Sequence, residues 1–103
     1  MDYQRIGIDQ AKKFIDACET IGLRFESVFL FGSYATNKMS EHSDIDLILV
    51  SNQFSGNPFL DAKLFGRANL KFPKIEAHPY TTKKFLSSTS FLEEIKLSAI
   101  QIK

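Results

Sequence analysis

Two short apolar segments near the middle of the chain, residues 27–31 and 44–50, restrict its fold more than any other feature. The first segment is apolar on both sides of the strand alternation, as in a strand that is buried on both faces, and the second is rich in Ile, Leu and Val. Both segments are also far shorter than the roughly 20 apolar residues of a membrane-spanning helix. We therefore expect them to be central strands of a sheet, and the rest of the chain must supply helices to cover it.

The flanking sequence has the periodicity of such helices. Apolar residues recur at steps of three and four over 8–21, and Gly22 would stop this helix. A second helix is predicted over 59–70, and Pro73 would break it. One face of this second helix carries a stripe of basic residues that we expect to be solvated: Lys63, Arg67 and Lys71.

Shorter elements complete the expected pattern. Residues 51–58, rich in Ser, Asn, Gly and Pro, are expected to form a mobile loop. The alternation of helices and strands predicts an α/β sheet with helices against it. The remaining elements are one or two helical turns over 34–39, a strand over 74–78 closed by Pro79, a short helix from Lys83 capped by Thr81-Thr82, a last helix capped by Ser90 with Glu93, and an edge strand over 99–102.

Charge, length and cysteine content narrow the classes of function. With 13 Lys+Arg against 12 Asp+Glu the net charge is +1, which argues against nucleic acid or a membrane surface as a partner. A chain of 103 residues fits one domain over 1–103, and its first residues lack the apolar core of a secretory signal, so we expect a cytoplasmic protein. Cys18 is the only cysteine and is expected in the core.

One pair of motifs is typical of a functional site: Gly32-Ser33, and then Asp44-Ile45-Asp46 at the start of the second apolar strand. Residues i and i+2 of a strand point to the same face, so the carboxylates of Asp44 and Asp46 should converge. Two anions so close are costly unless a cation neutralises them, and carboxylate oxygens suit Mg²⁺ together with substrate phosphates. The pair therefore predicts a metal–nucleotide site.

The Gly32-Ser33 dipeptide supports the same interpretation. A residue without Cβ at the end of a buried strand lets the backbone approach a ligand closely. The hydroxyl and amide of Ser33 can both donate to a phosphate oxygen, and a helix starting at Tyr34 would add its free N–H groups. We expect this loop to hold a triphosphate.

Gly32-Ser33-Tyr34-Ala35, followed by Ser43-Asp44-Ile45-Asp46-Leu47, resembles the signature of the polymerase-β-type nucleotidyltransferases. Because the chain is short, it is most similar to the stand-alone minimal nucleotidyltransferases of bacteria and archaea. The resemblance implies an α/β (α+β) fold with a small mixed β-sheet flanked by helices. It also implies three acidic residues that hold two Mg²⁺ ions, and a Gly-Ser loop that binds the phosphates of ATP or another nucleoside triphosphate.

The third acidic residue of such proteins lies on the next strand, where this chain has Glu76, one methylene longer than the commoner Asp. An Arg-Gly pair that often follows the Gly-Ser loop is replaced by Thr36-Asn37. Asn tolerates the left-handed backbone conformation that Gly would supply. Either Lys38 replaces the missing positive charge, or the nucleotide is bound more weakly.

His78 shares a strand face with Glu76 by the two-residue alternation. The simpler interpretation is a histidine that ends a strand in solvent. The alternative is that it contacts substrate or acts as a base.

The resemblance implies transfer of a nucleotide, AMP from ATP, to a hydroxyl acceptor. Minimal nucleotidyltransferases are typically paired with a small helical protein of the HEPN type, and in some pairs they act as antitoxins by modifying a tyrosine of that partner. Exposed aromatic residues such as Phe54 or Phe59 would then be candidates for the docking surface.

Two alternatives to this interpretation as a nucleotidyltransferase stay open. One is a non-catalytic module that binds a nucleotide or a partner, and the other is modification of a cationic small molecule, which would require an acidic pocket. The sequence also leaves open whether the chain forms a homo-oligomer.

Overall fold

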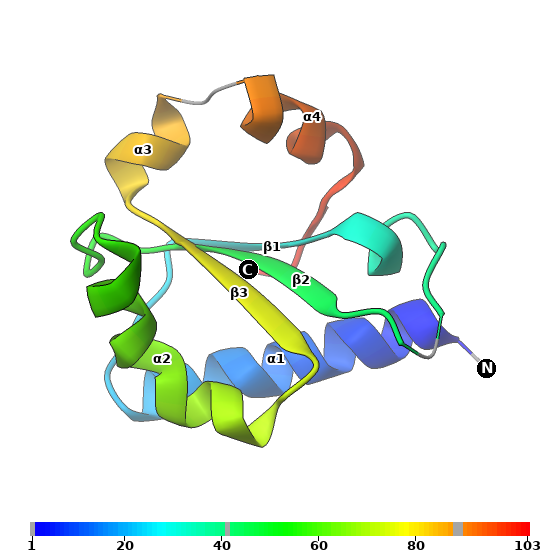
Figure 1. The fold of residues 1–103 in the computed structure, drawn as a ribbon, viewed down its shortest axis with the longest axis horizontal. Helices are drawn as coiled ribbons and strands as arrows, with labels where there is room; N and C mark the ends of the chain where they lie inside the picture. Colours follow the sequence, from blue (N-terminus) through cyan, green and yellow to red (C-terminus); the bar gives the residue numbers. More distant parts are fainter. Residues whose placement is uncertain (1, 41, 88–89) are drawn as a thin grey trace.

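The computed structural model describes residues 2–40, 42–87 and 90–103, in which helices surround a mixed sheet of four strands (Figure 1). The central pair, β1 and β2, is antiparallel, β4 pairs antiparallel with β1, and β3 pairs parallel with β2. The expected small mixed sheet flanked by helices is therefore confirmed. In sheet order the strands are β3 (Ile75–Tyr80), β2 (Ile45–Val50), β1 (Ser27–Phe31) and β4 (Ile100–Gln101).

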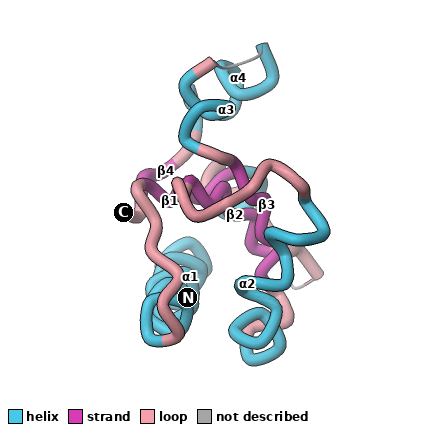
Figure 2. Tube along the Cα trace, turned by 90° about the vertical axis from the view of Figure 1, so that its left-hand side faces the viewer, coloured by secondary structure: helices cyan, strands magenta, loops and turns pink. Residues whose placement is uncertain are grey.

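Helices lie on both faces of the sheet, with α1 (Tyr3–Thr20) and α2 (Pro58–Lys71) on one side and α3 (Thr82–Leu86) and α4 (Ser90–Ser98) on the other (Figure 2). Burial on both faces, expected of β1, is complete only for one face, where Val28 and Leu30 lie, whereas the residues of its other face are half-buried. In β2 every apolar side chain is at most 2% exposed. No helix of the described residues is long and apolar enough to cross a bilayer.

The two faces of the sheet are covered to different extents. Alternate residues of β2, such as Leu47 and Leu49, pack in the large core beneath α1 and α2. On the opposite face Ile48 and Val50 pack with Leu92 of α4 in a smaller cluster. Asp46 precedes these two residues on that same face and lies outside the cluster. The sheet therefore keeps an open half around Asp46, and this half carries the polar site described below.

The one or two helical turns expected over 34–39 begin earlier and are shorter than expected. The chain instead forms a single 3₁₀ turn, Gly32–Tyr34, followed by a reversal in which Asn37 takes a positive φ of 61°. The Lys38 amide donates to the Ser33 carbonyl oxygen (2.9 Å), which closes this reversal. A left-handed residue so soon after the turn stops a helix from propagating. A longer helix dipole is therefore not available to the Gly-Ser loop.

Several element boundaries also differ from expectation. Strand β3 continues through Pro79, which Leu49 faces across the ladder, because an edge strand can accommodate a proline. Helix α1 begins five residues earlier than expected, at Tyr3, because the Asp2 side chain caps it by accepting from the Arg5 amide (3.0 Å). Ser90 is the first residue of α4, so the cap of that helix falls outside the described residues.

Residues 51–58 are anchored, and the expectation of a mobile loop is wrong. Phe54 is only 6% exposed because its ring packs against Phe25 and Phe65. The buried hydroxyl of Ser51 donates to the Arg24 carbonyl oxygen (2.6 Å). Phe54 is therefore a core residue and cannot belong to a docking surface, whereas Phe59 is 85% exposed.

Asp61 fixes the same loop to α2, and its removal should be costly. This buried carboxylate accepts from the Ser55 amide (2.7 Å), the Ser55 hydroxyl (2.9 Å) and the Gly56 amide (3.0 Å). Asp61→Ala should lower the free energy of unfolding by about 2–4 kcal/mol, because three donors of the loop lose a buried charged acceptor. Urea unfolding measures this loss. The exposed-residue control Asp9→Ala should change stability by less than about 0.5 kcal/mol, and an equal effect would contradict the assignment.

Two glycines inside helices predict opposite responses to alanine. A Cβ at Gly7 of α1 would lie 2.5 Å from the ring of Tyr34, whereas a Cβ at Gly66 of α2 would meet nothing within 4 Å. Gly7→Ala should destabilise the protein by about 1–2 kcal/mol through overpacking. Gly66→Ala should stabilise it by about 0.5–1 kcal/mol through helix propensity alone. Thermal unfolding of the two variants measures both changes in stability. A Gly7→Ala variant that is more stable than wild type would show that Tyr34 is not packed on α1.

Cys18 is fully buried on α1, as expected. Burial, with a smaller contribution from Glu19, raises the pKa of its thiol to about 12. A thiol in this state is inert as a nucleophile at neutral pH.

Candidate active site

Asp46, Glu76 and His78 come together on the open half of the sheet. Asp46 of β2 is paired with Glu76 of the parallel strand β3, and His78 follows two residues later on the same face. One ligand atom from each of these three side chains lies within 4.8 Å of the others. The parallel pairing of β2 with β3 in this register therefore brings together Asp46 and Glu76, two of the acids predicted from the sequence.

The two carboxylates repel each other. Partial burial raises the pKa of Asp46, and the charge of Glu76 raises it further. His78 opposes this rise, while a hydrogen bond with Glu76 and the charge of Asp44 add smaller increases. The side chain of Asp46 is 24% exposed and that of Glu76 is 56% exposed, so water screens the pair only in part. A cation would relieve this repulsion.

Gly32 brings the Gly-Ser turn directly against this group. Its φ is +74°, a backbone conformation that residues with a Cβ rarely adopt. A Cβ built at this position would lie 2.5 Å from Oδ2 of Asp46. Phe31, the residue before the glycine, also faces Asp46 across the ladder between β1 and β2. The turn therefore begins in contact with the carboxylate because Gly32 has no side chain.

The rest of the turn is short and is closed by its own hydrogen bonds. Ser33 is half-buried, and among the described residues no hydrogen bond uses its hydroxyl. Thr36 closes the turn by donating its hydroxyl to the Gly32 carbonyl oxygen (3.2 Å). The expectation that Asn37 can adopt the left-handed conformation is confirmed by its φ of 61°. Lys38 is exposed at the end of the reversal.

The structure treats the predicted site residues differently. Gly32, Asp46 and Glu76 lie together, and Ser33 follows Gly32 in the turn. Asp44 is exposed just before β2 begins and acts on the pKa of Asp46, but it is not one of the three residues grouped within 4.8 Å. His78 belongs to the group instead. The alternation along β3 placed His78 beside Glu76, but the sequence did not show that the imidazole reaches Asp46.

The donor set of this group fits a divalent cation. Two carboxylates bind hard ions such as Mg²⁺, and the remaining positions of such an ion are usually filled by water and substrate phosphates. The adjacent Gly32-Ser33 turn would meet those phosphates. Asp44, Asp46 and Glu76 are the acidic side chains that could hold the ion.

Stability should report the repulsion around Asp46. Because its pKa is raised in the folded protein above its ordinary value of 3.8, the folded state binds a proton more tightly than the unfolded chain. Stability of the metal-free protein should therefore fall as the pH rises from below 4 through the raised pKa. Asp46→Asn should remove this fall and be more stable than wild type at pH 7. Thermal unfolding in EDTA across this pH range tests the sign, and a lower stability of Asp46→Asn at pH 7 would contradict it.

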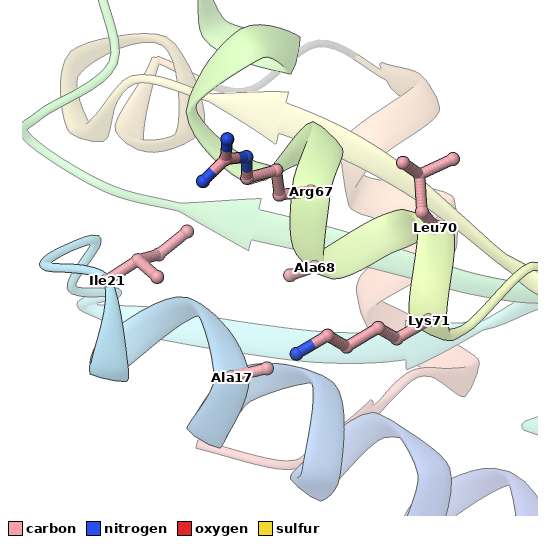
Figure 3. A pocket seen from close by; sticks show the side chains of 6 residues that line it. All are labelled: Ala17, Ile21, Arg67, Ala68, Leu70 and Lys71. Atoms are coloured by element: carbon pink, nitrogen blue, oxygen red, sulfur yellow. The ribbon is translucent and has the colours of Figure 1, made fainter.

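A concave surface lies on the helical layer, away from the carboxylates. A groove of about 430 Å³ between α1 and α2 is lined by apolar side chains, including Ile21 and Leu70, and by the cations Arg67 and Lys71 (Figure 3). Arg67 and Lys71 belong to the predicted basic stripe, whose three members are all exposed. The groove contains no acidic side chain and so lacks the chemistry to bind a metal ion.

The mixed sheet brings the paired acids and the Gly-Ser turn together, as the resemblance to the nucleotidyltransferases implies. The model of the nucleotidyltransferase domain family matches residues 11–100, and the chain belongs to that family. A crystal structure of a Sulfolobus solfataricus protein assigned as a nucleotidyltransferase superposes with a TM-score of 0.71 at 18% identity, covering 95% of this chain and 80% of that one. At this identity the likeness concerns the fold. A search of curated proteins finds no significant match.

Proposed function

We propose that the chain transfers a nucleotide, AMP from ATP, to a hydroxyl acceptor with the help of Mg²⁺. The observation that carries the proposal is the contact of Gly32 with Asp46 opposite Glu76, because the turn that we propose to bind phosphate then begins beside the acidic pair. Membership of the nucleotidyltransferase domain family supports the general reaction.

In the proposed reaction the acceptor oxygen attacks the α-phosphorus of ATP. The bond from the α-phosphorus to the bridging oxygen breaks, and pyrophosphate leaves. Glu76 is the proposed site to which the acceptor proton moves. Asp44 and Asp46 would hold the cation site from β2, with Glu76 completing it from β3. When bound, two Mg²⁺ ions would stabilise the leaving pyrophosphate and lower the pKa of the attacking hydroxyl.

The Gly-Ser turn would orient the triphosphate. The amides of Gly32 and Ser33 and the Ser33 hydroxyl are donors suited to phosphate oxygens. Lys38 would add a positive charge from the end of the turn, as a point charge rather than a two-pronged donor. This pre-arranged polar surface holds the α-phosphate in line with the acceptor.

The proposed acceptor is a hydroxyl of a partner protein, a tyrosine of a small helical protein of the HEPN type. The open half of the sheet leaves Glu76 more than half exposed, so a large acceptor can reach it. Incubation of the chain with α-labelled ATP, Mg²⁺ and the product of the adjacent reading frame tests this. Label on that protein, released as AMP by phosphodiesterase treatment, is expected. Retention of all label as ATP would overturn the proposal.

A second candidate, a non-catalytic partner-binding module, is favoured by the surface of α2. Leu70 and Phe59 are both more than four-fifths exposed there. The cations Arg67 and Lys71 beside the apolar groove would complement an acidic amphipathic segment of a partner. A stable complex without transferred label, weakened by Arg67→Glu, is the result that favours this module over the enzyme.

A further inference from the structure

We propose that His78 is a metal ligand together with Asp46 and Glu76, so that the site prefers a transition-metal ion such as Mn²⁺ to Mg²⁺. The inference rests on the proposed function, whose cation it specifies. Nε2 of His78 lies 3.9 Å from Oδ1 of Asp46 and 3.9 Å from Oε1 of Glu76. The imidazole nitrogen is therefore equidistant from the two carboxylates.

The spacing of these donors suits a common ion. Neighbouring ligands of a six-coordinate ion with bonds of about 2.1–2.2 Å are separated by about 3 Å, and opposite ligands by a little over 4 Å. The donors here span up to 4.8 Å, so small side-chain rotations bring all three within bonding range. Glu76 and His78 have room for this, since their side chains are 56% and 39% exposed.

Packing holds the imidazole over this group. The ring of His78 contacts that of Phe31, with centroids 5.4 Å apart and an interplanar angle of 59°. Phe31 is the strand residue opposite Asp46, so the aromatic contact crosses above the strand that carries the carboxylate. A histidine that merely ended a strand in solvent would not be fixed between two acids by a neighbouring ring.

An imidazole changes which ion the site selects. Mg²⁺ is bound almost entirely by oxygen, whereas imidazole nitrogen is a good ligand for first-row transition ions. Two carboxylates and one imidazole form a mixed donor set that Mn²⁺ accepts while still binding triphosphate oxygens. His78 is thus proposed as a specificity-determining residue for the metal.

Electron paramagnetic resonance of Mn²⁺ added to the full chain tests this directly, because pulsed spectra reveal nitrogen bound to the ion. Wild type should show modulation from one ¹⁴N nucleus, and His78→Asn and His78→Gln should lose it. Both variants should also weaken Mn²⁺ binding by about tenfold or more. Mg²⁺ binding, measured by competition, should change much less. The chain has one other histidine, so His42→Asn serves as the matched control and should keep the modulation.

The outcomes separate this inference from the proposed function. Mn²⁺ that binds to wild type without nitrogen modulation, or modulation that survives both His78 variants, overturns the role of His78 and leaves the acidic site standing. Wild type that binds neither Mn²⁺ nor Mg²⁺ overturns the metal site itself. Circular dichroism of each variant confirms that the fold is unchanged.

Discussion

Asp46→Asn should lower nucleotidyl transfer by about 10³-fold or more while the protein stays folded, because the variant loses a charged cation ligand at the reacting centre. Asp46 is the central member of the site. It pairs with Glu76 in the sheet and lies against the position where a Gly32 side chain would be. Asn keeps the shape of the side chain but not its charge, so the defect should appear in turnover and in metal binding.

The control for this experiment is Asp9→Asn, which removes one exposed carboxylate of α1. It changes net charge by the same amount and should retain activity. Initial rates with α-labelled ATP and calorimetric titration of the metal ion measure the two effects. Transfer by Asp46→Asn within tenfold of wild type would contradict the assignment of Asp46 to the catalytic site.

Gly32→Ala should abolish activity and also destabilise the fold. An alanine at φ +74° costs about 1–2 kcal/mol of backbone strain. Its Cβ would in addition lie 2.5 Å from Oδ2 of Asp46, which must then move away from Glu76. We expect a loss of stability of about 2–4 kcal/mol and a fall in transfer of about 10²-fold or more.

Gly22→Ala is a matched control for this substitution. Gly22 has a similar φ of +94°, but a Cβ there meets nothing within 4 Å. This variant should show the backbone strain alone, with activity unchanged. The difference between the two variants therefore isolates the contact with Asp46. Equal activity of Gly32→Ala and Gly22→Ala would show that the Gly-Ser turn does not have to approach the carboxylate.

The sequence predicted the parts of the structure that follow from local periodicity. Apolar residues on both sides of the alternation predicted β1, a run rich in Ile, Leu and Val predicted β2, and the distribution of apolar residues predicted α1 and α2. Asp46 and Glu76 came from a short motif and a resemblance, and the β2–β3 register now places them side by side. These features depend on residues that are close in sequence or on one strand pairing.

Long-range packing set the features that the sequence missed. The composition of residues 51–58 predicted a polar, flexible loop. In the structure the ring of Phe54 packs on Phe65 of α2, and Asp61 of α2 accepts a hydrogen bond from the Ser55 amide, so α2 holds the loop in place. The sequence indicates that Asn37 can take a positive φ, but it does not show that this residue ends the helical turn after Gly32 so early. The position of His78 between two acids depends on the ring of Phe31 on a non-adjacent strand.

We propose that the acidic pair and the Gly-Ser turn bind a metal–nucleotide complex as one site. Two-dimensional amide NMR of the ¹⁵N-labelled chain, titrated with Mg²⁺ and ATP, tests it most directly. We expect saturable chemical-shift changes at the amides of Gly32, Ser33, Asp46 and Glu76. These changes should be lost in Asp46→Asn. Spectra unchanged by Mg²⁺-ATP, or shifts confined to the α1–α2 groove around Arg67, would contradict it.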